Sequence, residues 1–219
     1  MPGMSAHAME AITGLRRPLA ATPAGQIDPG RIDLGGVAGV NLMEQSRAEA
    51  LLRTTVERLP AWADRSHALA SGFFSIGDGA RGYEHLVNLE YMYDQDLLNP
   101  DRPESLIYRV RPHGHRRLVA AMYYLLPGAR LASAPELGGR LTQFHVHRLL
   151  CLKPGSLTGV SQLPDGSCPP RTTRPKDNTP MIHVWIVPNR CGPFAALTDA
   201  GGGEVMPDER VHCDRVHGK

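Results

Sequence analysis

The sequence predicts an α+β fold in which N-terminal helices pack on a mostly antiparallel β-sheet. Apolar residues with helical spacing run through positions 41–59, and segments rich in β-branched and aromatic residues follow Gly72. The 23 glycines and 19 prolines among 219 residues are typical of a chain with many turns. A chain of this length can bury one sizeable core, so we expect a single domain.

The first expected helix begins after Asn41. Asn41 and Glu44 have the spacing of a capping box, and Ser46 and Glu49 repeat that spacing. Pro60 is expected to end this helix and to open a second, shorter one. The apolar residues between these signals share one helical face; they are Leu51, Leu52, Val56 and Leu59.

Four later segments have the composition and length of β-strands. Residues 105–110 and 116–126 flank the turn-like sequence RPHGH and predict a β-hairpin. Residues 142–152 and 180–188 predict two further strands. The proline-rich stretch 153–180 between them predicts a long surface loop, of the kind that covers a site or is disordered.

The ends of the chain lack sustained periodicity. Residues 1–40 are rich in Ala, Gly and Pro and predict a flexible N-terminal arm. Residues 199–219 begin with glycines and end with charged residues, which predicts a flexible C-terminal tail. The expected organisation is therefore one helix-plus-β domain over 41–198 between two mobile ends.

Charge and hydropathy exclude several classes of partner. The 24 basic and 22 acidic residues nearly cancel, so the chain lacks the basic surface of a dedicated nucleic-acid binder. The N-terminal residues contain no continuous apolar region like that of a secretory signal, and the longest apolar run, residues 118–126, is too short to span a bilayer. We expect a cytoplasmic protein that acts without nucleic acid or membrane.

Three histidines lie in the expected strands. His145 and His147 are two positions apart, so on one strand both side chains point to the same face, and His183 on a partner strand supplies a third imidazole. Three such nitrogens can hold one metal ion and leave positions open for water or substrate. The alternative is a set of structural histidines satisfied by hydrogen bonds.

His85 and Glu84 are candidates to complete the site. We expect His85 to be a fourth metal ligand and Glu84 to act as a ligand or as the catalytic general base. Both side chains are equally consistent with polar groups of a turn. The His113 and His115 pair lies in the basic turn, where we expect solvated side chains.

The four cysteines form no C-x-x-C pair, which argues against a zinc ribbon or a thioredoxin-like site. On one continuous strand, Cys151 would share a face with His145 and His147. There its thiol would pack in the core or bind a soft metal. A Cys151–Cys191 disulfide is a further alternative, and it would require export from the cytoplasm.

These patterns predict a mononuclear metal-dependent domain. The expected cofactor is one divalent transition metal (Zn, Fe, Cu or Mn), and the expected partner is a small organic substrate or ligand. Two alternatives stay open: a structural or sensory metal-binding domain, and a small-molecule-binding β-domain without metal.

The phrase GGRLTQFHVH resembles the first half of the cupin motif, with Gly139 ahead of His145 and His147. The resemblance implies a small cupin-like β-barrel that holds one metal through this pair, a glutamate and a histidine on a later strand. It also slightly favours oxidative chemistry over hydrolysis if the domain is an enzyme, because cupin-like histidine sites often hold redox metals. The chain departs from that pattern at two points. Cys151 stands near the place of the glutamate, and the residues before His183 lack the glycine spacing of the second motif.

A longer stretch, residues 46–197, resembles an uncharacterised group of bacterial, largely actinobacterial proteins. The shared phrases are GYEHLVN, LNPDRPESLIY, LVAAMYYLLPG, GGRLTQFHVHRLLC and MIHVWIVPNRCGPFAAL. This resemblance implies that His85, His145, His147 and His183 belong to one shared site.

Overall fold

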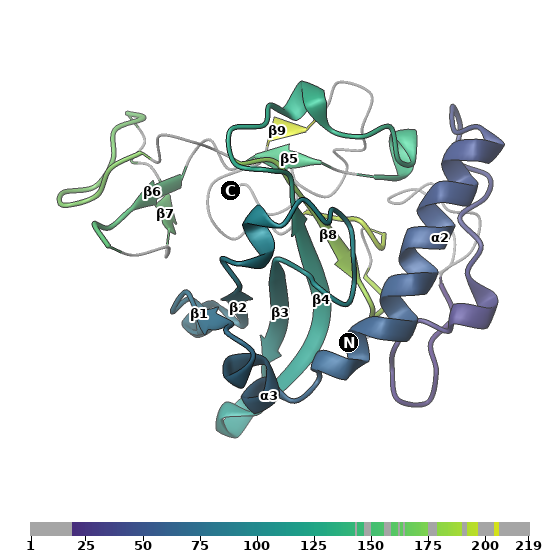
Figure 1. Cartoon of the computed structure of the whole chain (residues 1–219), viewed down its shortest axis with the longest axis horizontal. Helices are drawn as coiled ribbons and strands as arrows, with labels where there is room; N and C mark the ends of the chain where they lie inside the picture. Colours follow the sequence, from purple (N-terminus) through teal and green to yellow (C-terminus); the bar gives the residue numbers. More distant parts are fainter. Residues whose placement is uncertain are drawn as a thin grey trace.

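The fold is α+β, as the sequence predicts: one long helix packs on an antiparallel sheet in this computed structural model (Figure 1). The structure describes residues 19–142, 144–146, 150–155, 159–161, 163, 165–174, 179–189, 192–196 and 204–205.

Helix α2 (Leu42–Arg58) begins at the predicted capping box. The Asn41 side chain accepts a hydrogen bond from the Glu44 backbone N–H at 2.9 Å, and the Glu44 carboxylate accepts one from the Asn41 N–H at 2.7 Å. Ser46 lies inside the helix, so the second capping-box pattern marks no helix start. Leu51, Leu52 and Val56 are buried, which confirms the predicted apolar stripe.

The chain after α2 also follows the prediction. A 3-10 turn, η2 (Leu59–Trp62), carries Pro60 in its first positions, and the short helix α3 (Arg65–Ala70) comes next. Gly72 then adopts a φ of +90°, a left-handed conformation that suits glycine and ends the helical region.

The main sheet has the strand order β1-β2-β3-β4-β8-β5-β9, and each neighbouring pair is antiparallel. Its described strands leave β1 and β9 as two edges, so they do not close the barrel that the cupin resemblance implies. The strands are β1 (Phe74–Ser75), β2 (Tyr83–Val87), β3 (Ser105–Val110), β4 (Arg116–Tyr124), β5 (His145–Val146), β8 (Met181–Trp185) and β9 (Glu204–Val205).

The predicted hairpin is confirmed, because β3 pairs with β4 across the 3-10 turn η5 (Pro112–Gly114). His113 and His115 in this turn are exposed, as expected. The register shifts between Ile107 and Tyr108, so the hairpin contains an irregularity of the β-bulge type.

The single strand predicted over 142–152 is wrong. The structure divides it into β5, in the main sheet, and β6 (Leu150–Leu152), which pairs with β7 (Gly159–Ser161) in a separate two-stranded sheet. In Figure 1 this small sheet stands apart from the main one. Alternation along a strand holds only while the strand is continuous, so it does not place Cys151 on the face of His145.

Two cores lie on opposite faces of the main sheet. The larger, which we call the main core, joins α2 to one face through residues such as Leu52, Leu106 and Val184. A smaller cluster lies on the other face and consists of Ile107, Val119, Ala120, Met122, Met181 and Trp185. We call this second face the histidine face, because it carries His145 and His183.

The chain ends contribute more than the sequence suggests. Of the expected N-terminal arm, residues 1–18 lie outside the described part, but Ile27 and Leu34 are fully buried in the main core. The expected tail supplies β9, which pairs with β5. The described part of the N-terminal segment carries no periodic signal because its apolar residues are spaced by turns and one 3-10 turn, η1 (Pro29–Arg31).

Within these described ranges, no helix combines the length and the apolar character needed to cross a membrane.

Candidate metal site

Two of the predicted ligands, His145 and His183, meet in the interior. His145 lies on β5 opposite Met181, and His183 lies two residues further along β8, on the same face of the sheet. The ring centroids are 4.8 Å apart with planes tilted by 55°, and the residues are 0% and 1% exposed. His147 lies outside the described residues, so its place relative to this pair stays a prediction.

A thioether lies beside the pair. Met122 on β4 is the cross-strand partner of His183, and its Sδ is 2.8 Å from the His183 Nε2. Met122 is 4% exposed. The sequence prediction missed it because methionine on an apolar strand is usually a packing residue. Two imidazoles and one soft sulfur therefore come together from strands β5, β8 and β4.

Around these groups the histidine face is mostly apolar. Trp185 donates its indole N–H to the Ala195 carbonyl at 2.8 Å, which holds the 192–196 segment against this face. Ser105, the cross-strand partner of Met122 on β3, is fully buried. Its hydroxyl has no hydrogen-bond partner within the part of the chain that the structure describes.

No group of three or more His, Cys, Asp or Glu side chains that could hold a metal occurs among the described residues. The described part of the site thus consists of two histidines and one methionine.

His85 lies on the histidine face but at a distance from the pair. His85 lies opposite Ile107, Ile107 lies opposite Ala120, and Ala120 lies opposite Trp185. Strands β2 and β8 are therefore three strand spacings apart, about 14 Å. The His85 Nδ1 instead lies 2.5 Å from an Asp78 carboxylate oxygen, and its backbone N–H donates to the other oxygen at 3.0 Å. The structure therefore does not bring His85 to the other two rings.

Glu84 faces the opposite side of the sheet, because it alternates with His85 along β2 and pairs with Tyr108 of the main core. Arg65 donates two hydrogen bonds to its carboxylate at 2.7 and 3.0 Å, and Arg116 donates one at 2.7 Å. Burial raises the pKa of Glu84, but hydrogen bonds from Arg65, Ser75 and Arg116 outweigh it and lower this pKa to about 2. A carboxylate with so low a pKa is a weak base, and this arrangement favours a structural ion pair.

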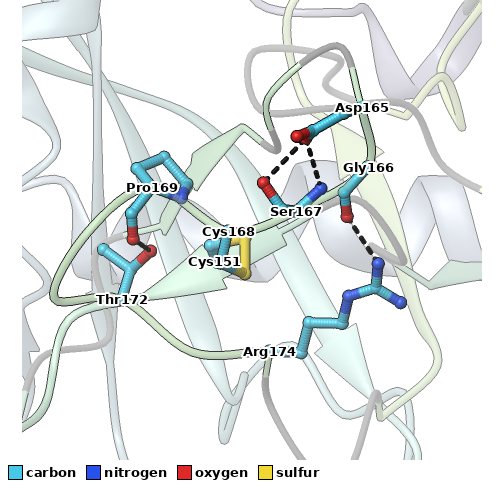
Figure 2. Close-up of a disulfide and its surroundings, with 8 residues drawn as sticks. All are labelled: Cys151, Asp165, Gly166, Ser167, Cys168, Pro169, Thr172 and Arg174. Atoms are coloured by element: carbon cyan, nitrogen blue, oxygen red, sulfur yellow. Dashed lines mark hydrogen bonds between the residues drawn. A yellow bond between two sulfur atoms is a disulfide. The ribbon is translucent and has the colours of Figure 1, made fainter.

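Cys151 forms a disulfide with Cys168, as Figure 2 shows. The bond ties β6 to the proline-rich segment 153–180. Within that segment, Asp165 accepts hydrogen bonds from the N–H and the hydroxyl of Ser167 at 2.9 and 2.7 Å, which form a local turn. This pairing corrects all three expectations for Cys151: a core thiol, a metal ligand and a bond to Cys191. Cys191 lies outside the described residues.

Glu104 is a buried acid that the sequence prediction did not single out. It is 2% exposed, and its Oε2 has no hydrogen-bond partner within the described ranges. Burial is the largest cause of a raised pKa at Glu104, and the nearby Asp94 and Asp96 carboxylates act in the same direction. Hydrogen bonds from the backbone of Glu104 and Tyr124 oppose them, and the pKa of Glu104 rises to about 8. The sequence feature that could have identified Glu104 as a buried acid is its position directly before the apolar strand that begins at Ser105.

Comparison of the chain with protein-family models, with curated proteins and with solved structures gives no match. The site must therefore be interpreted from its own chemistry.

Proposed function

We propose that this chain binds one transition-metal ion through His145 and His183, with His147 as a third ligand, and that it is a metal-dependent enzyme acting on a small organic molecule. The observation that carries the proposal is the burial of two imidazoles from different strands with ring centroids 4.8 Å apart. Placing two polar rings together away from water costs free energy unless hydrogen bonds or a metal ion compensate.

Imidazole is a common ligand of zinc, copper, iron and nickel. Three histidines would leave at least one coordination position for water, dioxygen or substrate. We favour oxidation over hydrolysis because the thioether of Met122, beside His183, suits a soft, redox-active metal. The catalytic role of Glu84 stays a prediction. Its ion pairs with Arg65 and Arg116 argue against that role.

A non-catalytic metal site is the second candidate. His145 and His183 are 0% and 1% exposed, and a site so inaccessible to water suits a metal ion whose coordination shell is filled by the protein and whose role is to stabilise the fold. An exchangeable water on the bound ion would favour catalysis, and a filled coordination shell would favour the structural role. A small-molecule-binding domain with no metal is the remaining alternative.

The test is elemental analysis of the full chain, purified without an affinity tag, next to three variants. We expect about one ion per chain in the wild type and near-complete loss in His145→Ala and His183→Ala. His85→Ala is the matched control and should keep its metal, because His85 is paired with Asp78 instead. A wild-type content far below one ion, with no thermal stabilisation by added metal, would refute the proposal.

Three wider predictions also remain proposals. The cupin-like fold depends on the phrase GGRLTQFHVH, and the membership of an actinobacterial group depends on the shared phrases given above. The cytoplasmic location has one observation against it: the Cys151–Cys168 disulfide is of a kind that persists mainly in oxidising compartments.

A further inference from the structure

We propose that the metal bound on the histidine face is copper(I) and that Met122 is one of its ligands. This inference rests on the proposed metal-binding function and makes it more specific. It replaces the divalent ion expected from the sequence with a monovalent one, and it adds a sulfur ligand to the histidines.

Donor atoms from three strands converge on the histidine face. His145 and Met181 are cross-strand partners, and so are His183 and Met122. Because positions 181 and 183 share a face, the two pairs lie next to each other on three adjacent strands. Within this group the Met122 Sδ and the His183 Nε2 point at each other at 2.8 Å.

An ion can enter between the Met122 sulfur and the His183 nitrogen after a small shift of the sulfur. A tetrahedral ion with bonds of about 2.0 Å to nitrogen and about 2.3 Å to sulfur needs about 3.5 Å between the two donor atoms. The present 2.8 Å separation would have to grow by about 0.7 Å. Methionine is unbranched and has three rotatable side-chain bonds, so its sulfur can move this far without a change in the backbone.

The low charge of the donor atoms favours a monovalent ion. The donor atoms are imidazole nitrogens and a thioether sulfur, which bring no negative charge to compensate a cation, and the residues are at most 4% exposed. The electrostatic cost of burying an ion rises with the square of its charge, so a monovalent ion is strongly favoured over a divalent one. Thioether and imidazole ligands together suit copper(I) in particular.

The apolar neighbours reinforce this preference. Ile107, Ala120 and Trp185 are buried on the same face within the small cluster that contains Met122. They limit the access of water, which would otherwise help to stabilise a doubly charged ion at this place.

The test measures copper(I) binding to the untagged full chain under anaerobic conditions, in competition with a chromophoric copper(I) chelator. Zinc(II) binding is measured in parallel. Met122→Leu conserves volume, so we expect it to fold, with copper(I) affinity lowered about tenfold or more and zinc(II) affinity changed by less than about twofold. Met181→Leu is the matched control and should leave both affinities within about twofold.

A second measurement identifies the sulfur directly. In selenomethionine-labelled protein, X-ray absorption at the copper edge should show a selenium neighbour, and Met122→Leu should abolish that signal. Selenium distinguishes methionine from any cysteine thiol. Absence of a selenium neighbour, or equal weakening by Met122→Leu and Met181→Leu, would overturn the assignment.

The outcomes separate this inference from the proposed function. If the chain binds zinc or iron through His145 and His183 and the Met122→Leu variant binds it equally well, the copper(I) assignment is wrong and the proposed metal-binding function stands. Failure of the wild type to bind any metal would overturn both.

Discussion

At the scale of single residues, the buried acids divide into two kinds. Glu84 and Glu104 are both nearly inaccessible to water, at 4% and 2% exposure. Glu84 has two arginine partners, and its pKa falls, whereas Glu104 is desolvated beside other carboxylates, and its pKa rises. The same residue type therefore makes opposite contributions to stability as the pH changes.

For Glu104 we predict a loss of stability as the pH rises from about 4.5 to about 8. The pKa is raised from 4.5 to about 8 in the folded protein, so the folded state holds its proton longer than the unfolded chain. The stabilisation is complete below pH 4.5 and is lost as the pH rises through about 8. Between pH 5 and pH 9, the free energy of unfolding should fall by about 1–3 kcal/mol less in Glu104→Gln than in the wild type, as measured by urea unfolding. Equal pH dependence in the two proteins would contradict the prediction.

For Glu84 we predict the opposite sign. Its pKa is lowered to about 2, so its contribution is present above pH 4.5 and is lost as the pH falls towards 2. Glu84→Gln should lower the free energy of unfolding by about 1–3 kcal/mol at pH 7, because Arg65 and Arg116 lose a charged acceptor. The control is Asp101→Asn at the exposed ion pair with Arg58, which should cost less than about 0.5 kcal/mol. A similar cost for both would show that burial of Glu84 adds nothing.

At the scale of elements, the sequence signals for helix ends predicted the structure more reliably than the uniform β-forming character of a segment predicted one continuous strand. The capping box at Asn41 and the glycine at position 72 act through neighbouring backbone atoms, so local sequence determines them. The segment 142–152 has uniform β-forming character, and nothing local marks the place where it leaves the main sheet for a second one. Strand pairing depends on the partners available, which are distant in the chain.

The small β6–β7 sheet gives a prediction at this scale. A two-stranded sheet is marginally stable by itself, and a disulfide across a separation of 17 residues contributes about 3 kcal/mol. Reduction, or the double variant Cys151→Ser/Cys168→Ser, should therefore open this unit while the main sheet stays folded. Hydrogen exchange should rise at the paired amides of Leu152 and Thr173 but stay unchanged in β4. If the protection of the Leu152 and Thr173 amides does not change, the disulfide does not hold the small sheet together.

At the scale of the whole molecule, the main core depends on a segment that precedes α2. Leu34 is fully buried, and its backbone N–H donates to the Glu49 carboxylate of α2 at 2.9 Å. This segment therefore joins the core through side-chain burial and scattered hydrogen bonds, such as the one from the Ile27 N–H to the Ile186 carbonyl at 2.8 Å, rather than through a long helix or strand.

We predict that Leu34→Ala lowers the free energy of unfolding by about 2–5 kcal/mol, because it removes buried methyl groups and leaves a cavity. Leu42→Ala is the matched control, since Leu42 is 83% exposed and should change stability by less than about 0.5 kcal/mol. Urea unfolding at pH 7 measures both. A small effect of Leu34→Ala would mean that this segment is dispensable for the core.

The sequence by itself determined the α+β class, the start and apolar face of α2, the hairpin of β3 and β4, and strand β8, because hydrophobic period and capping are local properties. It also placed His145 and His183 on neighbouring strands. The tertiary structure decided which groups meet: it added Met122, paired Cys151 with Cys168, left His85 with Asp78, and gave Glu84 two arginines. These contacts depend on strand order and register, which arise from packing across the whole chain.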